Sequence, residues 1–541
     1  MFKNREASFF LLAALLLFVL SLCLHLFRLG SVPPGFYWDE CAIGYNAWSL
    51  ALTGKDEYGT AWPMFFRCFD NYHEPVMVYV LVPFVKIFGL SKELVRLPGV
   101  FFHMAAAVMF YFLAYEHVRR RWMALFSALI FSLLPWAFPL SRVTMSGFMP
   151  MLLGICCGWF FLLRAMRRRS YYDAVLAALG WAFAMYAHNC GRPTTALTLV
   201  IFVLAFNLLL WKRRYVFMCF CGSFVLFMVP MILAVLRTPA ILSSRFDQIA
   251  VWKDNPAILV ILRRVAQRYF EYFSPKFLFI HGDSNLRHHS AWGGELFLFM
   301  APLVLLGIWV LLRHLRRNPI YRFLFFSLLA YPAATILTLD HMHATRSLNG
   351  APYWCVLALL GARFAWQHGK LLRKMVLLLM LFSLIEISAC FTWYFCTYPK
   401  VSRGWFDASF IESIEWAVSE RKEGERIYLS SSAFNYAIKG PDFKPFYYAP
   451  LLFCGRVPPD LYQREGLPNE IWQPYYPGRP LLWRGLLIRT NPLIGTEKMV
   501  MNNSEPLPPG AELLYRIKTE TPRTYEIYAV PAAVSPQNGG R

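Results

Sequence analysis

The sequence predicts an all-α membrane protein with many transmembrane helices, followed by a small α+β domain. Three observations support this class. The chain has 541 residues, of which 57% are hydrophobic and only 16% are charged, whereas soluble proteins carry roughly a quarter charged residues. Apolar runs of about 18 residues or more, each long enough to cross a hydrocarbon core, recur between residues 8 and 396. After residue 397, Pro- and Gly-rich stretches and short strand-like segments replace these runs.

Eleven apolar segments are expected to span the membrane, and basic clusters mark the side on which they connect. The segments are 8–28, 95–117, 122–139, 146–165, 171–188, 193–211, 215–236, 295–312, 321–338, 350–367 and 373–396. With this count every basic cluster falls on one side, which the positive-inside rule identifies as the cytoplasm. The clusters are Lys3/Arg5, Arg119–Arg121, Arg164–Arg169, Lys212–Arg214, Arg313–Arg317 and Lys370–Lys374. The protein is therefore expected in the cell membrane, with a cytoplasmic N-terminus and an extracytoplasmic C-terminal domain.

The apolar segment 76–88 tests this topology, because counting it as a span would place Arg119–Arg121 outside. It is also shorter than the roughly 20 residues that a spanning helix needs. We therefore expect a helix that lies in the outer interface, within a first outer loop of about residues 29–94. The alternative is a true but short span.

Two domains are expected on this basis. Residues 1–397 form a transmembrane catalytic domain, which presents the first loop and a long outer loop of about 237–294. Three outer turns add residues 140–145, 188–192 and 339–349. Residues 398–541 form the outer α+β domain, with a helix expected at 406–419 and strands at 426–429, 485–489, 512–518 and 525–530.

Charge and cysteine content exclude other classes. The net charge of +22 comes from short Lys/Arg clusters between spans, which is how orientation is set, so nucleic acid is not an expected partner. Most of the twelve cysteines lie in apolar runs, and none forms a CxxC or His/Cys metal pattern. Cys41 and Cys68 both fall in the first loop, and the sequence leaves a disulfide between them open.

The candidate catalytic residues lie in the first loop. Asp39 and Glu40 follow the first span directly, and His73 and Glu74 precede the interfacial segment. The other outer segments supply cationic or imidazole side chains near helix ends, where charge is costly without a partner or a role. These residues are Arg96, Arg142, Arg192, Arg287, His289, His343 and Arg346. Acids on one loop facing Arg and His on others suit a base acting beside a bound phosphate.

The reaction expected from this arrangement is sugar transfer from a lipid phosphate. Nucleotide sugars are absent outside the cytoplasmic membrane, so an activated sugar there has to be carried by a lipid. Asp39 would take the proton of the acceptor hydroxyl, and the Arg residues would stabilise the departing phosphate. Tyr37, Trp38 and Tyr45 would frame the sugar or anchor the loop at the interface.

Each residue also has a simpler explanation. Asp39 and Glu40 are suited to cap a helix that begins near Cys41. Arg96 is suited to reach the interface from a span, and Arg142 and Arg346 to pair with nearby acids. Glu74 before Pro75 fits a turn, and His289 and His343 fit ordinary surface positions. No cofactor is expected, since the spacing of the His residues gives no support for a metal.

The ordered series of motifs resembles the polyprenyl-phosphate-sugar-dependent membrane glycosyltransferases of the GT-C class, in particular the protein O-mannosyltransferase and aminoarabinose-transferase-like branch. It spans roughly residues 8–397. The pieces are PPGFYWDECAIGYNAWSLALTGKDEYG (33–59), YHEPVMVYVLVPFVKIFGLSKELVRLP (72–98), PLSRV (139–143), HNCGRP (188–193), GDSNLRHHSAWGGELFLFMAP (282–302) and HMHATRSLNGAP (341–352).

The resemblance implies the GT-C fold and an inverting transfer of a hexose or pentose, with Asp39 as base or acceptor-orienting residue and Glu40 beside it. Glu74 falls at the family's polar position before the Pro that opens the interfacial helix. Arg96 and Arg346 match basic positions near the lipid phosphate, and Arg192 matches a motif Arg. The turn LSRVTMSG has no acid where many relatives carry one, so no second-loop acid or metal is carried over.

The expected partners are a polyprenyl-phosphate-linked sugar donor, the bilayer, and an acceptor that is a protein, a lipid or a glycan. The sequence decides neither the sugar nor the acceptor. A polytopic transporter or flippase for a lipid-linked glycan is the main alternative, and a receptor-like membrane protein is another. Transporters place charged residues at the midplane within repeated halves, whereas here the ionisable residues gather at one face and no repeat is evident.

Overall fold

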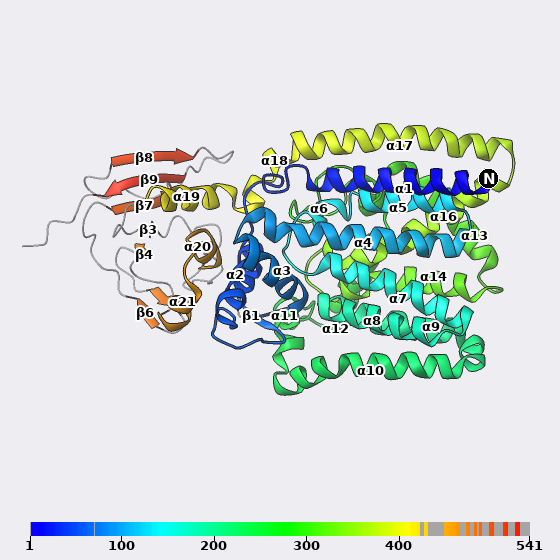
Figure 1. The fold of residues 1–541 in the computed structure, drawn as a ribbon, viewed down its shortest axis with the longest axis horizontal. Helices are drawn as coiled ribbons and strands as arrows, with labels where there is room; N and C mark the ends of the chain where they lie inside the picture. Colours follow the sequence, from blue (N-terminus) through cyan, green and yellow to red (C-terminus); the bar gives the residue numbers. More distant parts are fainter. Residues whose placement is uncertain are drawn as a thin grey trace, which may run out of the picture.

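The computed structural model shows an elongated molecule, with a helical bundle at one end and a small sheet at the other (Figure 1). The residues that it describes are 2–69, 71–421, 427–430, 448–465, 472–475, 481–483, 486–488, 497–502, 512–517 and 525–530. The bundle contains a helix in each of the eleven segments that the sequence predicts to be spans. Six of the described helices are long and apolar enough to cross a membrane by length and composition.

The bundle helices are defined as follows. They are α1 (Phe2–Leu26), α4 (Lys92–Val118), α5 (Arg121–Leu133), α7 (Phe148–Arg168), α8 (Tyr171–Ala187), α9 (Gly191–Lys212), α10 (Arg214–Arg237), α13 (Ala301–His314), α14 (Pro319–Ala330), α16 (Ala351–Gln367) and α17 (Lys370–Cys396). α5, α13 and α14 are clearly shorter than the sequence predicts. α5 ends before Pro135, because a proline disfavours helical geometry in the residue that precedes it. α14 gives way at Tyr331 to a 3-10 turn, and α13 begins only at Ala301.

Close helix contacts in the bundle depend on glycine. A Cβ added at Gly154 of α7 would lie 2.7 Å from the carbonyl oxygen of Gly180 in α8. A Cβ at Gly180 would lie 2.6 Å from the backbone nitrogen of Gly158. Small residues let helices approach closely where no hydrophobic effect drives them together, as in a bilayer. These glycines therefore hold α7 and α8 together.

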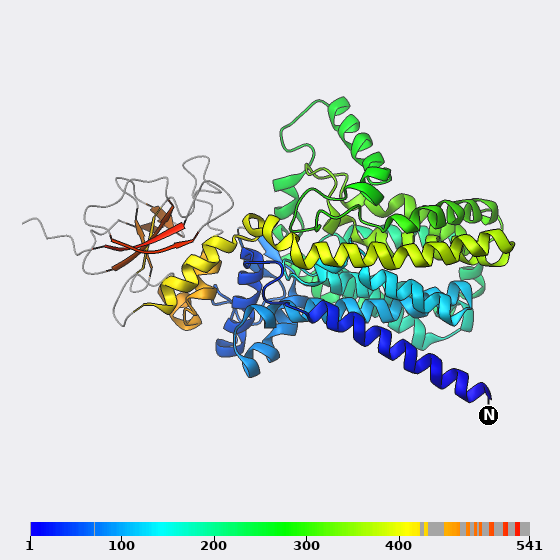
Figure 2. The same ribbon diagram turned by 90° about the horizontal axis from the view of Figure 1, so that it is seen from above.

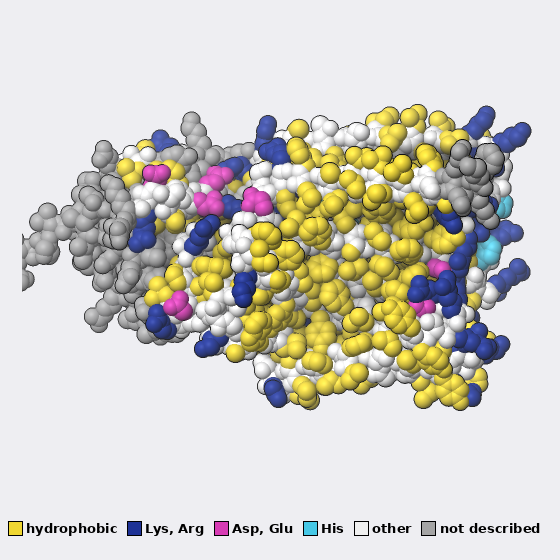
Figure 3. All heavy atoms as spheres, viewed as in Figure 1, with side chains coloured by type: hydrophobic (Ala, Val, Ile, Leu, Met, Phe, Trp, Pro, Cys, Tyr) yellow, Lys and Arg dark blue, Asp and Glu magenta, His cyan; other side chains and the backbone are white. Residues whose placement is uncertain are grey.

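The two ends of the bundle differ in charge. Lys and Arg side chains gather at the end where the chain begins, and apolar side chains cover the flank (Figure 3). The junctions α4/α5, α7/α8, α9/α10, α13/α14 and α16/α17 all lie at this end (Figure 1). We call it the basic end, and the opposite end the loop end. The apolar flank and the long apolar helices make this a membrane protein.

The first loop folds at the loop end. It contains α2 (Trp38–Thr53), β1 (Phe66–Cys68), β2 (Asn71–His73) and α3 (Pro75–Phe88). α3 packs beside α2 at the tip of the bundle (Figures 1 and 2). Its residues Met77, Val78, Leu81 and Val85 are buried, whereas Ile87 and Phe88 are more than 70% exposed. This is the arrangement expected of an interfacial helix. Cys41 and Cys68 are both buried free thiols, so the disulfide that the sequence left open is not formed.

Other outer segments complete the loop end. α11 (Ala240–Ile249), α12 (Ile258–Glu271) and the π-helical turn η1 (Lys276–Ile280) follow α10. The short helices are α6 (Phe138–Ser141) and α15 (Ala344–Ser347), and the 3-10 turns are η2 (Leu298–Met300), η3 (Tyr331–Ala334) and η4 (Leu348–Gly350). Arg268 of α12 donates to the carbonyl oxygens of Thr338 and Leu339, which ties the long loop to the turn before α15.

The C-terminal residues form a mixed sheet that is attached to the first loop. After α18 (Tyr398–Val401) and η5 (Arg403–Phe406) comes α19 (Ala408–Ser419), which packs on a five-stranded sheet of order β4-β3-β7-β9-β8. These strands are β3 (Ile427–Ser430), β4 (Trp472–Tyr475), β7 (Glu497–Asn502), β8 (Glu512–Ile517) and β9 (Tyr525–Val530); β5 (Leu481–Trp483) and β6 (Leu486–Ile488) form a hairpin. The four strands and the helix that the sequence predicts here are confirmed as β3, β6, β8, β9 and α19.

Two short helices make the attachment. α20 (Tyr448–Cys454) and α21 (Pro459–Glu465) pack on α2. Tyr448 donates to Glu57 Oε1 over 2.6 Å, and Gln463 donates to the Asp56 carbonyl oxygen over 2.9 Å. The first loop is therefore packed between the bundle and residues that follow it by about 400 positions.

Candidate active site

Asp39 lies in the first turn of α2, with a side chain that is about 25% exposed. His73 Nε2, at the end of β2, lies 3.7 Å from Asp39 Oδ1. Because β2 leads directly into α3, this ion pair joins the two halves of the first loop. Asp39 is thus both held in place and accessible, which is what a base acting on an incoming hydroxyl requires.

Glu40 has a different role from its neighbour. Its side chain is fully buried, and its two oxygens accept from Arg96 over 2.9 and 3.0 Å. The same carboxylate accepts from the backbone N–H of Tyr37, so the capping role that the sequence allowed for is confirmed for Glu40. α2 begins at Trp38, three residues earlier than expected. Glu40 has no exposed surface for a substrate, which argues against the catalytic role expected for it.

Arg96 also departs from its expected role as a phosphate ligand. Its side chain is fully buried. Besides Glu40, it donates to the carbonyl oxygens of Leu29, Pro33 and Gly35 over 2.9 to 3.2 Å. All five N–H bonds of the guanidinium are used in these contacts. Arg96 therefore fixes the chain between α1 and α2 and has no donor left for a phosphate.

Arg142 and His289 both have structural roles, because their side chains are bonded to backbone groups of the protein. Arg142 donates to Leu24, His25, Phe27 and Val32, so it satisfies the carbonyl oxygens at the C-terminal end of α1. His289 is fully buried, with Nε2 3.3 Å from the Gly294 carbonyl oxygen and Nδ1 accepting from Ala291.

Burial lowers the pKa of His289 to about 4, so it carries no charge to attract a phosphate. The role expected for Tyr45 beside the sugar or at the interface is also wrong. Its ring is buried under α20 and α21, and its hydroxyl donates to the Val457 carbonyl oxygen.

Glu74 and Arg192 face each other across the start of α3. Arg192 NH2 lies 4.0 Å from Glu74 Oε1, too far for a hydrogen bond, and neither atom has a partner among the described residues. Ser146 donates to the other Glu74 oxygen over 3.4 Å. Burial raises the pKa of Glu74, although the positive charge of Arg192 opposes that rise. An open acid–base pair of this kind is suited to accept hydroxyl or phosphate groups.

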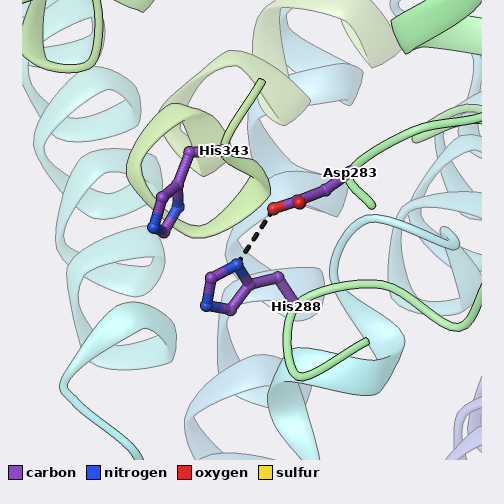
Figure 4. Close-up of side chains that lie close together, drawn as sticks. All are labelled: Asp283, His288 and His343. Atoms are coloured by element: carbon purple, nitrogen blue, oxygen red, sulfur yellow. Dashed lines mark hydrogen bonds and ion pairs between the residues drawn. The ribbon is translucent and has the colours of Figure 1, made fainter. Parts of the chain in front are cut away.

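Asp283, His288 and His343 form a compact cluster of polar side chains at the loop end (Figure 4). His288 Nδ1 lies 2.9 Å from Asp283 Oδ2, and the two imidazole rings stack at 4.3 Å. The backbone N–H groups of Ala344 and Asn285 donate to the same carboxylate. These hydrogen bonds lower the pKa of Asp283 although burial acts to raise it. Asp283 therefore fixes the orientation of His288.

This cluster is also the place where a metal would fit. One ligand atom from each of Asp283, His288 and His343 lies within 4.8 Å of the other two. A carboxylate with two imidazoles is a ligand set found at catalytic Zn²⁺ sites. The three residues follow no metal-site spacing in the sequence, because His343 comes from a separate turn. The absence of a metal stays a prediction.

Arg287 and Arg346 border this cluster. Arg287 donates to the Tyr37 hydroxyl, with its guanidinium 4.4 Å from the centre of the Tyr37 ring, which is packed on Trp38. Arg346 donates to Thr338 and Asp340 over 2.9 and 2.6 Å, so the pairing with a nearby acid that the sequence allowed for is observed. Both guanidiniums have N–H groups that no described residue accepts.

Eight of the expected residues are linked one to the next by interactions or by neighbouring positions in the chain, and we call this set the ring. Its members are Tyr37, Asp39, His73, Glu74, Arg192, Arg287, His343 and Arg346. Asp39 pairs with His73, which precedes Glu74, and Glu74 faces Arg192. Glu74, Arg192 and Arg346 all act electrostatically on the Cys190 thiol, whose pKa burial raises to about 12. Burial and the positive charges of Arg346 and Arg287 hold the pKa of His343 well below its usual value. Arg287 donates to the hydroxyl of Tyr37, which lies two residues before Asp39 in the chain.

Glu295, like Asp283 and His288, belongs to this site but is not among the site residues that the sequence analysis predicts. The prediction placed it in a span, but its side chain is fully buried in the loop and accepts from the Asp283 backbone N–H over 2.9 Å. Its other oxygen has no partner among the described residues. An acid directly after Gly293–Gly294, at the start of an apolar run, was the available signal.

Comparison with known proteins identifies the fold. The structure of ArnT from Cupriavidus metallidurans bound to undecaprenyl phosphate matches with a TM-score of 0.54 at 14% identity, over 97% of this chain and 98% of that one. ArnT in the apo state gives 0.49 at 12% identity over the same shares of both chains.

The arabinosyltransferase EmbB from Mycobacterium smegmatis gives a TM-score of 0.39 at 16% identity, over 64% of this chain and 30% of that one. No protein-family model and no curated protein sequence matches the chain. With a helix in every predicted span, a folded first loop and a match along nearly its whole length, the chain has the GT-C membrane fold of the ArnT structure.

Proposed function

We propose that this protein is a membrane glycosyltransferase that moves a sugar from a polyprenyl-phosphate donor to an acceptor on the outer side of the cytoplasmic membrane. The observation that carries the proposal is the accessible Asp39–His73 pair, set in a ring of groups that includes Arg192, Arg287 and Arg346. The match to a structure that contains undecaprenyl phosphate supports a lipid phosphate as the ligand of this ring.

The proposed chemistry is a single displacement. The oxygen of the acceptor hydroxyl attacks the anomeric carbon, and the Asp39 carboxylate takes the hydroxyl proton. The bond between the anomeric carbon and the phosphate oxygen breaks, and its electron pair leaves with the polyprenyl phosphate. Attack from the face opposite the leaving group inverts the anomeric centre.

The guanidiniums of Arg287 and Arg346 would stabilise the leaving phosphate. The leaving polyprenyl phosphate gains a second negative charge as the bond breaks. N–H groups of Arg287 and Arg346 that no described residue accepts are available to bind its oxygens. Because charge-assisted hydrogen bonds strengthen as that charge develops, they lower the barrier rather than only holding the donor.

The flippase alternative would use the same lipid but no base. The concentration of ionisable groups at one end of the bundle, rather than in two repeated halves, favours the enzyme. The domain boundary near residue 397 remains part of the proposal, with the C-terminal residues acting on the acceptor side through their contacts with α2.

Asp39→Asn tests the proposal, with Glu6→Gln as the matched control, because Glu6 is an exposed acid of α1 at the basic end, opposite the ring. Mass spectrometry of outer-surface glycoconjugates compares cells that lack the gene with cells that carry each variant. We expect Asp39→Asn to lower transfer about 100-fold or more, as for loss of a general base. The control should restore the wild-type glycans.

Purified Asp39→Asn should still bind undecaprenyl phosphate, which separates loss of chemistry from loss of the donor site. Wild-type glycan levels in Asp39→Asn cells would refute the base. Surface glycoconjugates that do not depend on the gene would refute the glycosyltransferase.

A further inference from the structure

A cavity of about 170 Å³ opens at the basic end, on the opposite side of the bundle from the ring around Asp39. α4, α7, α14 and α16 each contribute to its wall. The side chains that matter for its chemistry are Glu116, His117, Arg167, Asn318, Tyr321 and Arg363.

Positive charge is in excess around this cavity. Glu116 is its one wall carboxylate among the described residues, and it accepts from Arg119 over 2.6 Å and from Arg167 over 2.5 Å. Arg363 lies beside them and donates through one nitrogen to the His117 carbonyl oxygen over 3.0 Å. The wall thus carries the two guanidiniums of Arg167 and Arg363 and one carboxylate, which is already paired with Arg167 and with Arg119 outside the wall. Arg167 and Arg363 each keep N–H groups that no described residue accepts.

His117 adds a polar atom without a partner. Its Nδ1 lies 2.8 Å from the Leu113 carbonyl oxygen, so Nδ1 carries the hydrogen. Its Nε2 is buried, and no described residue bonds to it. A buried imidazole nitrogen without a partner costs free energy unless a ligand or water supplies one. A P–OH group or a headgroup hydroxyl would donate to it.

α14 adds its N-terminal end to the same cavity. Asn318 caps this twelve-residue helix by accepting from the Ile320 N–H over 2.9 Å, and Asn318 and Tyr321 both line the wall. The positive end of a helix dipole stabilises an anion placed there. Arg313 in the last turn of α13, with Arg316 and Arg317 on the connection to α14, lines a second and more open hollow, and these residues increase the local positive potential.

We infer that this cavity is a second anion site, which binds one phosphate group at the basic end of the membrane domain. The volume of about 170 Å³ has room for a phosphate and is well below the roughly 300 Å³ where pockets for larger ligands begin. The phosphate comes either from the headgroup of an acidic phospholipid or from free inorganic phosphate. Basic pockets between transmembrane helices are known to take lipid headgroups.

Native mass spectrometry of the purified full-length protein tests the site. The protein is titrated separately with dioctanoyl phosphatidylglycerol, with zwitterionic dioctanoyl phosphatidylcholine and with inorganic phosphate. Arg363→Gln removes the guanidinium, and Arg363→Lys keeps the charge but loses the fork geometry. Arg373→Gln is the matched control, because Arg373 is an exposed Arg of α17, at the same end but outside the cavity wall.

We expect wild type and Arg373→Gln to bind phosphatidylglycerol more tightly than phosphatidylcholine. Arg363→Gln should weaken phosphatidylglycerol binding about tenfold, and Arg363→Lys by a smaller factor. Loss of inorganic phosphate binding in the same variants would assign the site to free anions as well, whereas binding of the lipid alone would assign it to a headgroup.

The inference would be overturned if wild type and Arg363→Gln bound phosphatidylglycerol equally and also bound inorganic phosphate equally. If Arg363→Gln does not fold, the comparison of Arg363→Lys with wild type decides in the same way.

Discussion

Glu40 and Arg96 form a two-point ion pair in which both side chains are fully buried, with Nε to Oε1 at 2.9 Å and NH2 to Oε2 at 3.0 Å. The pair joins the first turn of α2 to α4. Asp39, the adjacent acid, instead points to His73 and remains accessible. Two neighbouring carboxylates therefore have separate tasks, since the Glu40 pair fixes the helix that presents Asp39.

Removing one member of this pair should be costly. Glu40→Gln leaves the Arg96 guanidinium buried without its counter-charge, so we expect a loss of about 3–5 kcal/mol in stability. Thermal unfolding of the purified protein measures it. Arg96→Met should be at least as costly, because it also leaves the carbonyl oxygens of Leu29, Pro33 and Gly35 without their donor. A Glu40→Gln protein as stable as wild type would show that the pair is not needed.

Asp283 should matter for turnover rather than for folding alone. Asp283→Asn keeps the size of the side chain but removes the negative charge that orients His288. If the proposed transfer takes place at this ring, we expect a drop of about tenfold or more in kcat, with Glu6→Gln as control. His288→Ala should lower kcat to a similar extent. An additive effect in the double variant would contradict a shared role, since coupled residues are not additive.

Asp407 should make stability depend on pH near neutrality. Burial raises its pKa to about 7, although Arg287 opposes the rise. A folded-state pKa above the unfolded value means that the folded protein binds more protons between the two values, so stability falls as pH rises from about 4 to about 7 and then levels off. Asp407→Asn removes this term, and Asn tolerates the left-handed backbone at φ 50°.

Thermal unfolding of wild type and Asp407→Asn between pH 5 and pH 8.5 checks this prediction. The variant should gain stability relative to wild type as pH increases, and the difference should be smallest at pH 5. A difference that is constant across the range would show that Asp407 has an ordinary pKa.

Glu386 should act as a cap inside the membrane domain. It lies in the middle of α17 and accepts from the backbone N–H groups of Leu298 and Phe299 over 2.6 and 3.0 Å, at the start of η2. Glu386→Leu leaves both donors unsatisfied, so we expect a loss of about 1–2 kcal/mol. Glu386→Gln keeps an acceptor oxygen and should lose less. Equal unfolding temperatures for the Leu and Gln variants would argue against capping.

The sequence determined which segments form the bundle helices and which helix junctions lie at the same end of the bundle. Apolar runs placed each of the eleven bundle helices, because a helix in a bilayer satisfies its backbone hydrogen bonds locally and depends on length and composition alone. The basic clusters correctly predicted which helix junctions share one end. The strands β3, β6, β8 and β9 followed from short-range pattern as well.

Tertiary structure decided what each polar residue does. Arg96, Arg142 and His289 carry the chemistry that a phosphate site needs, yet other groups of the protein already bind them. Arg96 and Arg142 donate to carbonyl oxygens near the end of α1, Arg96 also donates to Glu40, and His289 contacts the Gly294 carbonyl oxygen of its own loop. Asp283, His288 and His343 come together only because the long loop packs against the turn before α15. A residue type gives the donors and acceptors that a side chain has, whereas long-range packing selects which of them are already paired and which remain for a ligand.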